Sequence, residues 1–347
     1  QTTRNRITAV CQRGETQFVF LDTPGVLAEA TCSAREGMLR FTYPESADSR
    51  LTIDFARRVG EINHPKRFSY QEIEILSPTE FQGEIYCDHR DGGWGHGEGN
   101  VDYTLYFHAT CSKPLEDIER IGGDSNAVLR CRFPTAKGET VTLHVALSYE
   151  DIPPKPTGFD FDAMRTAAKR AWTDEIANRI AVEGGTEDER IIFATALYPA
   201  MIDPRPVGRG DGFTRRTVFS GWDVFRTEMP FLTLFFPEVV TDTVNAMMGV
   251  MESGRRDTLP VWDLFGCKSG CMIGNPLIPV ILTAQEAGLG GIDYAKALDL
   301  AVKTTEKRGN LACGYTPDSL SETLEYCFDD WCVSEIARRL GRDDVAV

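Results

Sequence analysis

The hydrophobic pattern of the chain changes its period once, at a segment with three prolines that spans residues 151–158. Before this segment, short stretches alternate apolar and polar residues between turn residues, which is typical of antiparallel strands with one buried face. Strands are predicted at 18–21, 38–43, 51–55, 73–75, 83–86, 101–107, 128–133 and 141–145. Residues 1–150 are therefore expected to form a β-sandwich domain.

After the prolines, apolar residues recur at three- and four-residue steps, as on one face of a helix. This spacing predicts helices at 161–180, 186–200, 222–236, 239–252, 278–287, 294–305 and 319–340. Thr186 and Glu189 have the spacing of a capping box, and Pro237 is expected to end a helix. Glycines stand where helix C-caps belong, at Gly254, Gly288 and Gly341. Residues 151–185 are read as a linker with a helix, followed by a helical domain.

Composition excludes several classes of function. The formal net charge of -15 argues against binding to nucleic acid or to anionic membranes. No apolar run reaches the roughly 20 residues of a membrane span. The ten cysteines include no Cys-x-x-Cys, and no histidine follows position 144, which argues against a zinc site. Scattered cysteines in a chain of this length favour reduced, buried thiols over a disulfide framework.

The helical half lacks the residues of a Ser-His or Cys-His nucleophile, and its glycine-rich pieces match neither a P-loop nor a dinucleotide fingerprint. Carboxylates, arginines and aromatic residues remain. This set suits carbohydrate, because aromatic rings lie against apolar sugar faces while carboxylates accept hydrogen bonds from hydroxyls.

Two of these residues stand out in an apolar segment at 219–237, where Asp223 and Arg226 are spaced to share one side of a helix. One interpretation is a core helix whose first turn carries an acid for the helix dipole and a local ion pair. The other is a sugar-binding wall. Three carboxylates near the end of the chain, at Glu322, Glu325 and Asp329, form either an acid cluster or a solvated helix face.

Seven segments taken in order resemble glycoside hydrolase family 92, the calcium-dependent exo-acting α-mannosidases. They are Phe-Thr-Tyr-Pro-Glu-Ser at 41–46, Val-Glu-Gly-Gly at 182–185, Ala-Leu-Tyr at 196–198, Phe-Ser-Gly-Trp-Asp-Val-Phe-Arg at 219–226, Leu-Pro at 259–260 with Trp262, Gly-Cys-Met-Ile-Gly at 270–274, and Thr-Leu-Glu-Tyr at 323–326 with Asp329 and Asp330. The resemblance implies a multidomain β plus α protein: an antiparallel β-sandwich, a helical linker and an (α/α)6 barrel.

The resemblance also implies an inverting mechanism, with a general acid and a carboxylate base about 6.5–9.5 Å apart, and a Ca²⁺ ion bound to two vicinal mannose hydroxyls. The family carries its acid in a Glu-Gly-Asn-x-Trp-Gln-Tyr-like motif and its base in a Gly-Asn-Asp-Asp-x-Gly-Gln-like motif. Neither the Glu-Gly-Asn at 98–100 nor the Gly-Arg-Asp-Asp at 341–344 continues as these motifs require. No catalytic residue is therefore assigned, and the calcium ligands are expected mostly outside the chain.

Helix counting leads to the expectation of a fragment. An (α/α)6 barrel needs twelve helices, and about six are predicted between 186 and 340, so residues 186–347 are expected to form the first half of a barrel. The sandwich in 1–150 also lacks the opening segments that the resemblance implies. Half a barrel cannot close its inner ring, and self-association through the incomplete helical domain is expected.

The resemblance implies substrate-binding roles for a few residues of this chain. Asp223 is expected to bind mannose hydroxyls, with a cavity wall formed by Trp222, Arg226, Trp262, Cys271 and Met272. Mannose-containing glycans are the expected partners. Asn275 and Pro276 stand where members often have an aromatic residue and a histidine, so the linkage preference stays open.

Two other functions remain open: a non-catalytic glycan-binding protein, and a disaccharide phosphorylase-like enzyme on a similar scaffold. The compartment also stays open, since the resemblance favours an extracytoplasmic protein whereas scattered cysteines favour a reducing one.

Overall fold

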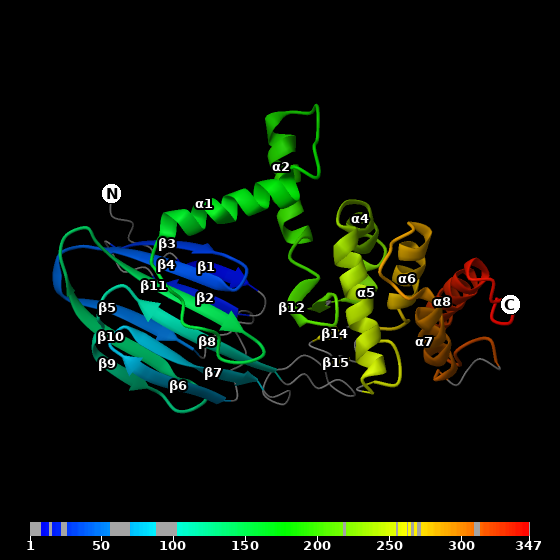
Figure 1. Cartoon of the computed structure of the whole chain (residues 1–347), viewed down its shortest axis with the longest axis horizontal. Coiled ribbons are helices and arrows are strands. Elements are labelled where there is room, and N and C mark those ends of the chain that lie inside the picture. Colours follow the sequence, from blue (N-terminus) through cyan, green and yellow to red (C-terminus); the bar gives the residue numbers. More distant parts are fainter. Residues whose placement is uncertain are drawn as a thin grey trace. The chain divides into compact units, whose positions relative to one another are not determined.

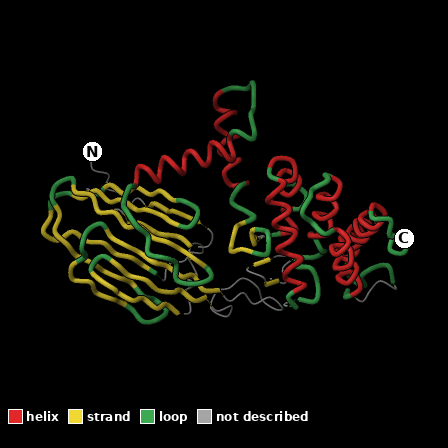
Figure 2. Tube along the Cα trace, in the orientation of Figure 1, coloured by secondary structure: helices red, strands yellow, loops and turns green. Residues whose placement is uncertain are grey.

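The computed structural model describes residues 8–13, 16–21, 26–55, 70–87, 103–217, 220–254, 256–261, 263–264, 267–268, 272–308 and 313–346. These residues divide into two compact units, one made of described residues up to Ala181 and one that begins at Val182. The first unit holds the long strands and the second holds most of the helices (Figure 1, Figure 2). Each unit is described here by itself.

The first unit is built on two antiparallel sheets. The larger sheet has the order β3 (Leu27–Cys32), β4 (Glu36–Tyr43), β11 (Glu139–Ser148), β8 (Tyr103–Cys111), β7 (Glu80–Cys87) and β6 (Tyr70–Ser77). The smaller sheet has the order β5 (Ser46–Asp54), β10 (Val128–Thr135) and β9 (Glu116–Ile121). A separate hairpin pairs β1 (Thr8–Arg13) with β2 (Thr16–Leu21). The predicted antiparallel β domain, followed by helices, is confirmed.

Aromatic side chains of the two sheets meet in the core of this unit. The ring of Tyr43 on β4 lies edge-on to Phe133 of β10, with 5.5 Å between ring centroids. Phe55, directly after β5, stacks on Phe107 of β8 at 5.0 Å. Leu129 and Phe133 are almost fully buried. Contacts between large rings from facing sheets contribute much of the apolar burial of a sandwich.

Two of the edge strands, β3 and β9, were not predicted by alternation, whereas the edge strands β5 and β6 were. Most side chains of β3 and β9 are exposed or half-buried, and each strand ends its sheet. A strand without a consistently buried face has no reason to alternate apolar and polar residues. The central strands β4, β8, β10 and β11 include the predicted positions, and burial alternates along β10, whereas residues 141–146 of β11 are all buried.

Two buried histidines hold the segment that leads from the sheet to the first helix. His108 Nδ1 lies 3.2 Å from the carbonyl oxygen of Pro153, and His144 Nδ1 lies 2.9 Å from that of Gly158. The second ring nitrogen of each histidine faces a carboxylate, Glu80 and Glu36 respectively. Because carbonyl oxygens only accept hydrogen bonds, each Nδ1 carries a proton. The proline-rich segment is therefore fastened to the sheet and is not a free linker.

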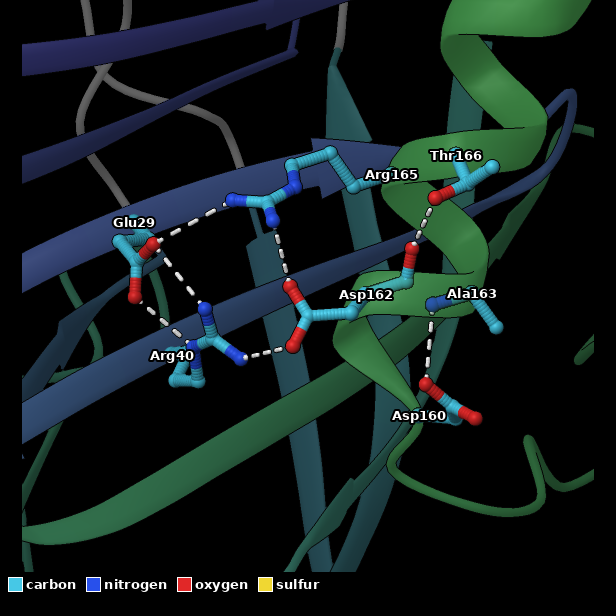
Figure 3. A network of polar contacts seen from close by, with 7 residues as sticks. All are labelled: Glu29, Arg40, Asp160, Asp162, Ala163, Arg165 and Thr166. Atoms are coloured by element: carbon cyan, nitrogen blue, oxygen red, sulfur yellow. Dashed lines mark hydrogen bonds and ion pairs between the residues drawn. The ribbon is translucent and has the colours of Figure 1, made fainter.

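The helix α1 (Phe161–Trp172) packs on β3 and β4 through a polar network, which Figure 3 shows. The Arg40 guanidinium binds both carboxylate oxygens of Glu29, at 2.8 and 3.0 Å, and Oδ2 of Asp162 at 3.0 Å. It also lies 4.1 Å from the ring centroid of Phe161, a buried residue. Arg165 bonds the other Asp162 oxygen at 2.8 Å. The side chains of the predicted apolar stripe from 161 to 180 are the less exposed ones of this segment.

Arg40→Ala is expected to lower the free energy of unfolding of this unit by about 2 kcal/mol, because it removes a bidentate pair and a ring contact together. Arg40→Lys keeps the charge but loses the planar fork, so its loss is expected to be about half as large. Urea unfolding followed by circular dichroism measures both. Arg50→Ala is the matched control, since among the described residues the Arg50 side chain forms an ion pair with Asp48 alone, at an exposed position. Equal losses for Arg40→Ala and Arg50→Ala contradict the prediction.

The second unit contains α2 (Glu187–Ala200), α5 (Pro237–Glu252), α6 (Leu277–Glu286), α7 (Tyr294–Glu306) and α8 (Leu320–Arg339). Helix α6 packs against α5, α7 and α8 around side chains that are fully buried. Several predicted ends are confirmed: Thr186 and Glu189 form the capping box, and Pro237 begins α5 directly after the preceding helix. The glycines at 254, 288 and 341 have the positive φ of helix C-caps.

The single helix predicted at 222–236 is wrong. The structure has two helices there, α3 (Gly221–Val224) and α4 (Glu228–Phe235), joined by a turn. The reason is Pro230, which in one continuous helix would clash with the carbonyl of Arg226 and leave it without a donor. Starting a new helix at Glu228 places Pro230 in its first turn, where the missing N–H costs no hydrogen bond.

A hairpin of β12 (Arg205–Arg209) and β13 (Thr214–Thr217) packs on α5. Asp242 of α5 accepts the backbone N–H of Thr214 at 3.1 Å and pairs with Arg216 at 3.2 Å. A second, minimal hairpin joins β14 (Asp263–Leu264) and β15 (Cys267–Lys268).

The described helices of this unit contain no segment long and apolar enough to cross a membrane.

Candidate sugar-binding site

Asp223 lies in the first turn of α3, where it is exposed to solvent and held in place by Ser220. Ser220 is the N-cap: its buried hydroxyl accepts the backbone N–H of Asp223 at 3.4 Å and donates to Oδ2 of the same residue. Asp223 itself is exposed. Ser220 is its only side-chain hydrogen-bonding partner in the described part of the chain. The carboxylate therefore keeps free acceptor positions for a ligand.

Gly221 places this turn close to the protein backbone. A Cβ at this position would lie 2.3 Å from the carbonyl oxygen of Val261 and 2.9 Å from Cγ of Pro276. Any larger residue would push α3 away from both neighbours. The position of Asp223 thus depends on the segments around 261 and 276, which contact the start of α3.

Arg226 links α3 to α8 and does not pair with Asp223. Its Nη2 lies 3.1 Å and 3.4 Å from the two carboxylate oxygens of Glu325. Its guanidinium covers the ring of Phe225 at 4.1 Å and that of Trp222 at 5.2 Å. The local ion pair of the core-helix interpretation is therefore not formed. Among the described residues, nothing accepts from the buried indole nitrogen of Trp222.

A row of stacked rings continues from this arginine along α8. Phe225 stacks on Phe328 with 6.1 Å between centroids, and Phe328 stacks on Trp331 at 5.9 Å. Phe225 is buried, whereas half of the Trp331 surface is exposed. Aromatic rings beside exposed carboxylates and a guanidinium are the combination that sugar recognition uses.

A turn at 272–276 borders the same region. Met272 and Gly274 both have positive φ, 62° and 78°, and the Met272 side chain is exposed. The backbone N–H of Asn275 donates to Oδ2 of Asp329 at 2.7 Å. Asp329 is buried, and this burial raises the pKa of its carboxyl to about 7. The turn is therefore fastened to α8.

The structure brings together part of the predicted set. Trp222, Asp223 and Arg226 lie on or shortly after α3, and the exposed side chain of Met272 lies on the turn at 272–276. Trp262 and Cys271 lie outside the described residues. The predicted carboxylate cluster on α8 is divided, because Glu325 binds Arg226 whereas Asp329 binds Asn275. The sequence did not predict that Glu325 pairs with Arg226 or that Asp329 accepts from Asn275. The four-residue spacing of Glu325 and Asp329 indicated only that both acids lie on one side of a helix.

The described residues do not form a metal site by themselves. Within the described ranges, no group of three or more histidine, cysteine, aspartate or glutamate side chains has the arrangement of a metal site. The described donors therefore do not fit a calcium ion by themselves, and no ligand is assigned in this chain.

Two family models match the chain. The glycosyl hydrolase family 92 N-terminal domain matches residues 17–148, and the glycosyl hydrolase family 92 catalytic domain matches residues 149–347. A curated relative from the fungus Arthroderma benhamiae, described as an uncharacterized secreted glycosidase, is 24% identical over 216 residues, which are 54% of this chain and 25% of that protein.

Solved structures agree with these matches. The family GH92 alpha-mannosidase BT3965 from Bacteroides thetaiotaomicron has a TM-score of 0.82 and 26% identity over 95% of this chain and 49% of its own. The same protein has been solved with mannoimidazole. The GH92 inverting mannosidase BT2199 from the same organism shares the fold, with a TM-score of 0.78 and 20% identity over 99% of this chain and 51% of its own.

This chain spans about half the length of these solved relatives. Because the catalytic-domain model alone matches more than half of the chain and the N-terminal model matches most of the rest, the family assignment does not depend on any single motif. The chain belongs to glycoside hydrolase family 92.

Proposed function

We propose that the whole protein is a glycoside hydrolase that removes terminal α-linked mannose from glycans. Family membership supports glycoside hydrolysis, and the similarity to BT3965, an alpha-mannosidase, supports mannose as the sugar. The observation that carries the proposal is the exposed Asp223 carboxylate, oriented by the buried Ser220 hydroxyl beside Trp222 and Arg226. A carboxylate held in this way can accept hydrogen bonds from two sugar hydroxyls.

Asp223 is proposed to bind mannose hydroxyls, and the wall of the site is proposed to consist of Trp222, Arg226, Trp262, Cys271 and Met272. The rings supply apolar contact with a sugar face. Arg226 would contact the sugar while it is still paired with Glu325, which holds its guanidinium in place. The wall would orient the sugar, and the proton transfers would come from other residues.

The general acid and base are proposed to lie outside this chain. The mechanism is proposed to be inverting, as in BT2199, which is an inverting mannosidase, with a base that activates water on the face opposite the leaving group. Ca²⁺ is proposed as the cofactor from the family resemblance, with its ligands mostly outside this chain; the described residues hold no group of three or more metal-binding side chains. The domains are proposed as a sandwich at 1–150, a linker with a helix at 151–185 and the first half of an (α/α)6 barrel at 186–347.

A location outside the cytoplasm is proposed from the secreted relative. Six cysteines have described thiols and all six are free, three of them buried, so this proposal does not rest on disulfides. The alternative is a non-catalytic glycan-binding protein, which would bind the sugar at the same residues but would not hydrolyse the glycosidic bond. A phosphorylase is less favoured, because both family models describe glycosyl hydrolases. Self-association through the helical domain stays a prediction, which light scattering tests.

The whole protein is expected to hydrolyse an aryl α-mannoside and α-linked mannobiose, and to lose this activity when a chelator removes calcium. Readdition of Ca²⁺ is expected to restore turnover. Turnover that needs phosphate would favour the phosphorylase, and binding of mannobiose without release of mannose would favour the glycan-binding protein. Full activity in chelator would contradict the calcium part of the proposal.

A further inference from the structure

The start of α3 and the buried carboxylate of α8 are connected through one short piece of chain. Asp329 accepts the N–H of Asn275 at 2.7 Å, and Pro276, the next residue, lies against Gly221 at the start of α3. Asp223 lies two residues after Gly221 in the same helix. A displacement of the turn at 272–276 would therefore act on the sugar-binding carboxylate without any direct contact between Asp329 and the sugar.

The turn needs this support because its backbone conformation is unfavourable. Met272 has a φ of 62°, a region that side chains with a Cβ rarely occupy. Such a conformation costs on the order of 1 kcal/mol or more and persists only when the surroundings impose it. Gly274, at a φ of 78°, lies close to α8: a Cβ there would be 3.4 Å from Cβ of Glu325 and 3.5 Å from Oδ2 of Asp329.

The Asp329 carboxyl lies in an almost closed environment, with 2% of its surface exposed. An acceptor in such a place holds its donor firmly, because neither group can exchange its partner for water. Asn275 is buried as well. The hydrogen bond between them thus anchors the buried end of the turn, whereas Met272 at the other end is exposed.

We propose that Asp329 is a positioning residue: by accepting the Asn275 N–H it holds the turn at 272–276 against the first turn of α3, and so places Asp223 for the sugar. This inference rests on the sugar site proposed above and adds a residue that touches no ligand. The inference also gives α8 a role in supporting the site. Asp329 holds the turn, and Glu325, four residues earlier on the same helix, holds Arg226.

The test compares mannoimidazole binding by the whole protein and its variants, measured by calorimetry. Asp329→Ala removes the acceptor and is expected to weaken binding about tenfold or more, the effect of losing a hydrogen bond to a charged or buried acceptor. Asp329→Asn keeps an acceptor oxygen and is expected to stay within about threefold of the parent protein. Hydrogen exchange of the 272–276 segment is expected to accelerate in Asp329→Ala and not in Asp329→Asn.

Ile336→Ala is the control for lost stability. Ile336 is fully buried on the same helix, and its truncation is expected to destabilise the unit without touching the turn. If it weakens binding as much as Asp329→Ala, the effect is general and the positioning role is overturned. Gly274→Ala provides a second variant should Asp329→Ala fail to fold, since a residue with a Cβ is strained at this positive φ, where the turn faces α8; it too is expected to weaken binding.

The failures can be told apart. If the parent protein binds mannoimidazole and Asp329→Ala binds it equally well, the positioning role is wrong while the proposed function stands. Tenfold weaker binding by a folded Asp329→Asn would also overturn it. If the parent protein does not bind mannoimidazole, the proposed function fails and this inference fails with it.

Discussion

Asp223→Asn is expected to weaken mannoimidazole binding to the whole protein by about 100-fold, because two charge-assisted hydrogen bonds are each worth about tenfold in affinity. The amide keeps the size of the side chain and one acceptor oxygen, but it loses the charge and the second acceptor. Since Asp223 is exposed and lies at the start of a helix of four residues, the fold is not expected to depend on its charge. The melting temperature is expected to change by less than about 2 °C.

Asp188→Asn is the matched control, since Asp188 is an exposed aspartate in the first turn of α2. It is expected to leave both binding and melting unchanged. If Asp223→Asn binds mannoimidazole normally and melts early, Asp223 serves the helix and not the sugar, and the core-helix interpretation is correct. Calorimetry and thermal melting of the same samples decide between the two.

Unfolding free energy is expected to decrease by about 4 kcal/mol between about pH 4 and pH 8 through the titration of Asp329 alone. Burial raises the pKa of this carboxyl to about 7 in the folded protein, above its ordinary 3.8. In that pH range the unfolded chain has released the proton that the folded protein still binds, so stability falls as the pH rises. The Asn275 N–H and Arg308 lower the pKa of this carboxyl and Glu325 and Asp330 raise it, each acting more weakly than burial.

Asp329→Asn is expected to flatten this part of the pH dependence, because an amide does not titrate. Urea unfolding at several pH values measures the slope. A second contribution of the same sign remains in the variant: burial also raises the pKa of Glu228 to about 7, with a smaller effect of Asp203. Asp343→Asn, at an exposed position after α8, is the control and should keep the parent slope. An unchanged slope in Asp329→Asn would contradict the prediction.

Local signals predicted many elements and their ends. The capping box of Thr186 and Glu189 and the C-cap at Gly288 need only residues within one or two turns, so the sequence contains all the relevant interactions. The buried strands of the first unit were predicted for a similar reason, because a strand with one face in the core must alternate. The edge strands β3 and β9 lack that constraint and were missed.

The site was less predictable because its contacts connect distant parts of the chain. Helical spacing placed Asp223 and Arg226 on one side of a helix, but Pro230 breaks that helix and Arg226 binds Glu325, 99 residues away. Asp329 and Asn275 are 54 residues apart, and the spacing of acids on α8 could not show which of them would be buried. Periodicity tells which residues share a face, but not which element covers that face.

The sequence by itself determined the division into a β domain and a helical part, and its ordered motifs identified the family, because hydrophobic period and short motifs are properties of contiguous residues. Only the tertiary structure decided which charged groups are paired and which remain available to a ligand. The physical reason is burial: packing α8 against the turn at 272–276 removes water from Asp329 while it leaves Asp223 in solvent. That difference is the basis on which two aspartates of the same chemistry are proposed to have different roles.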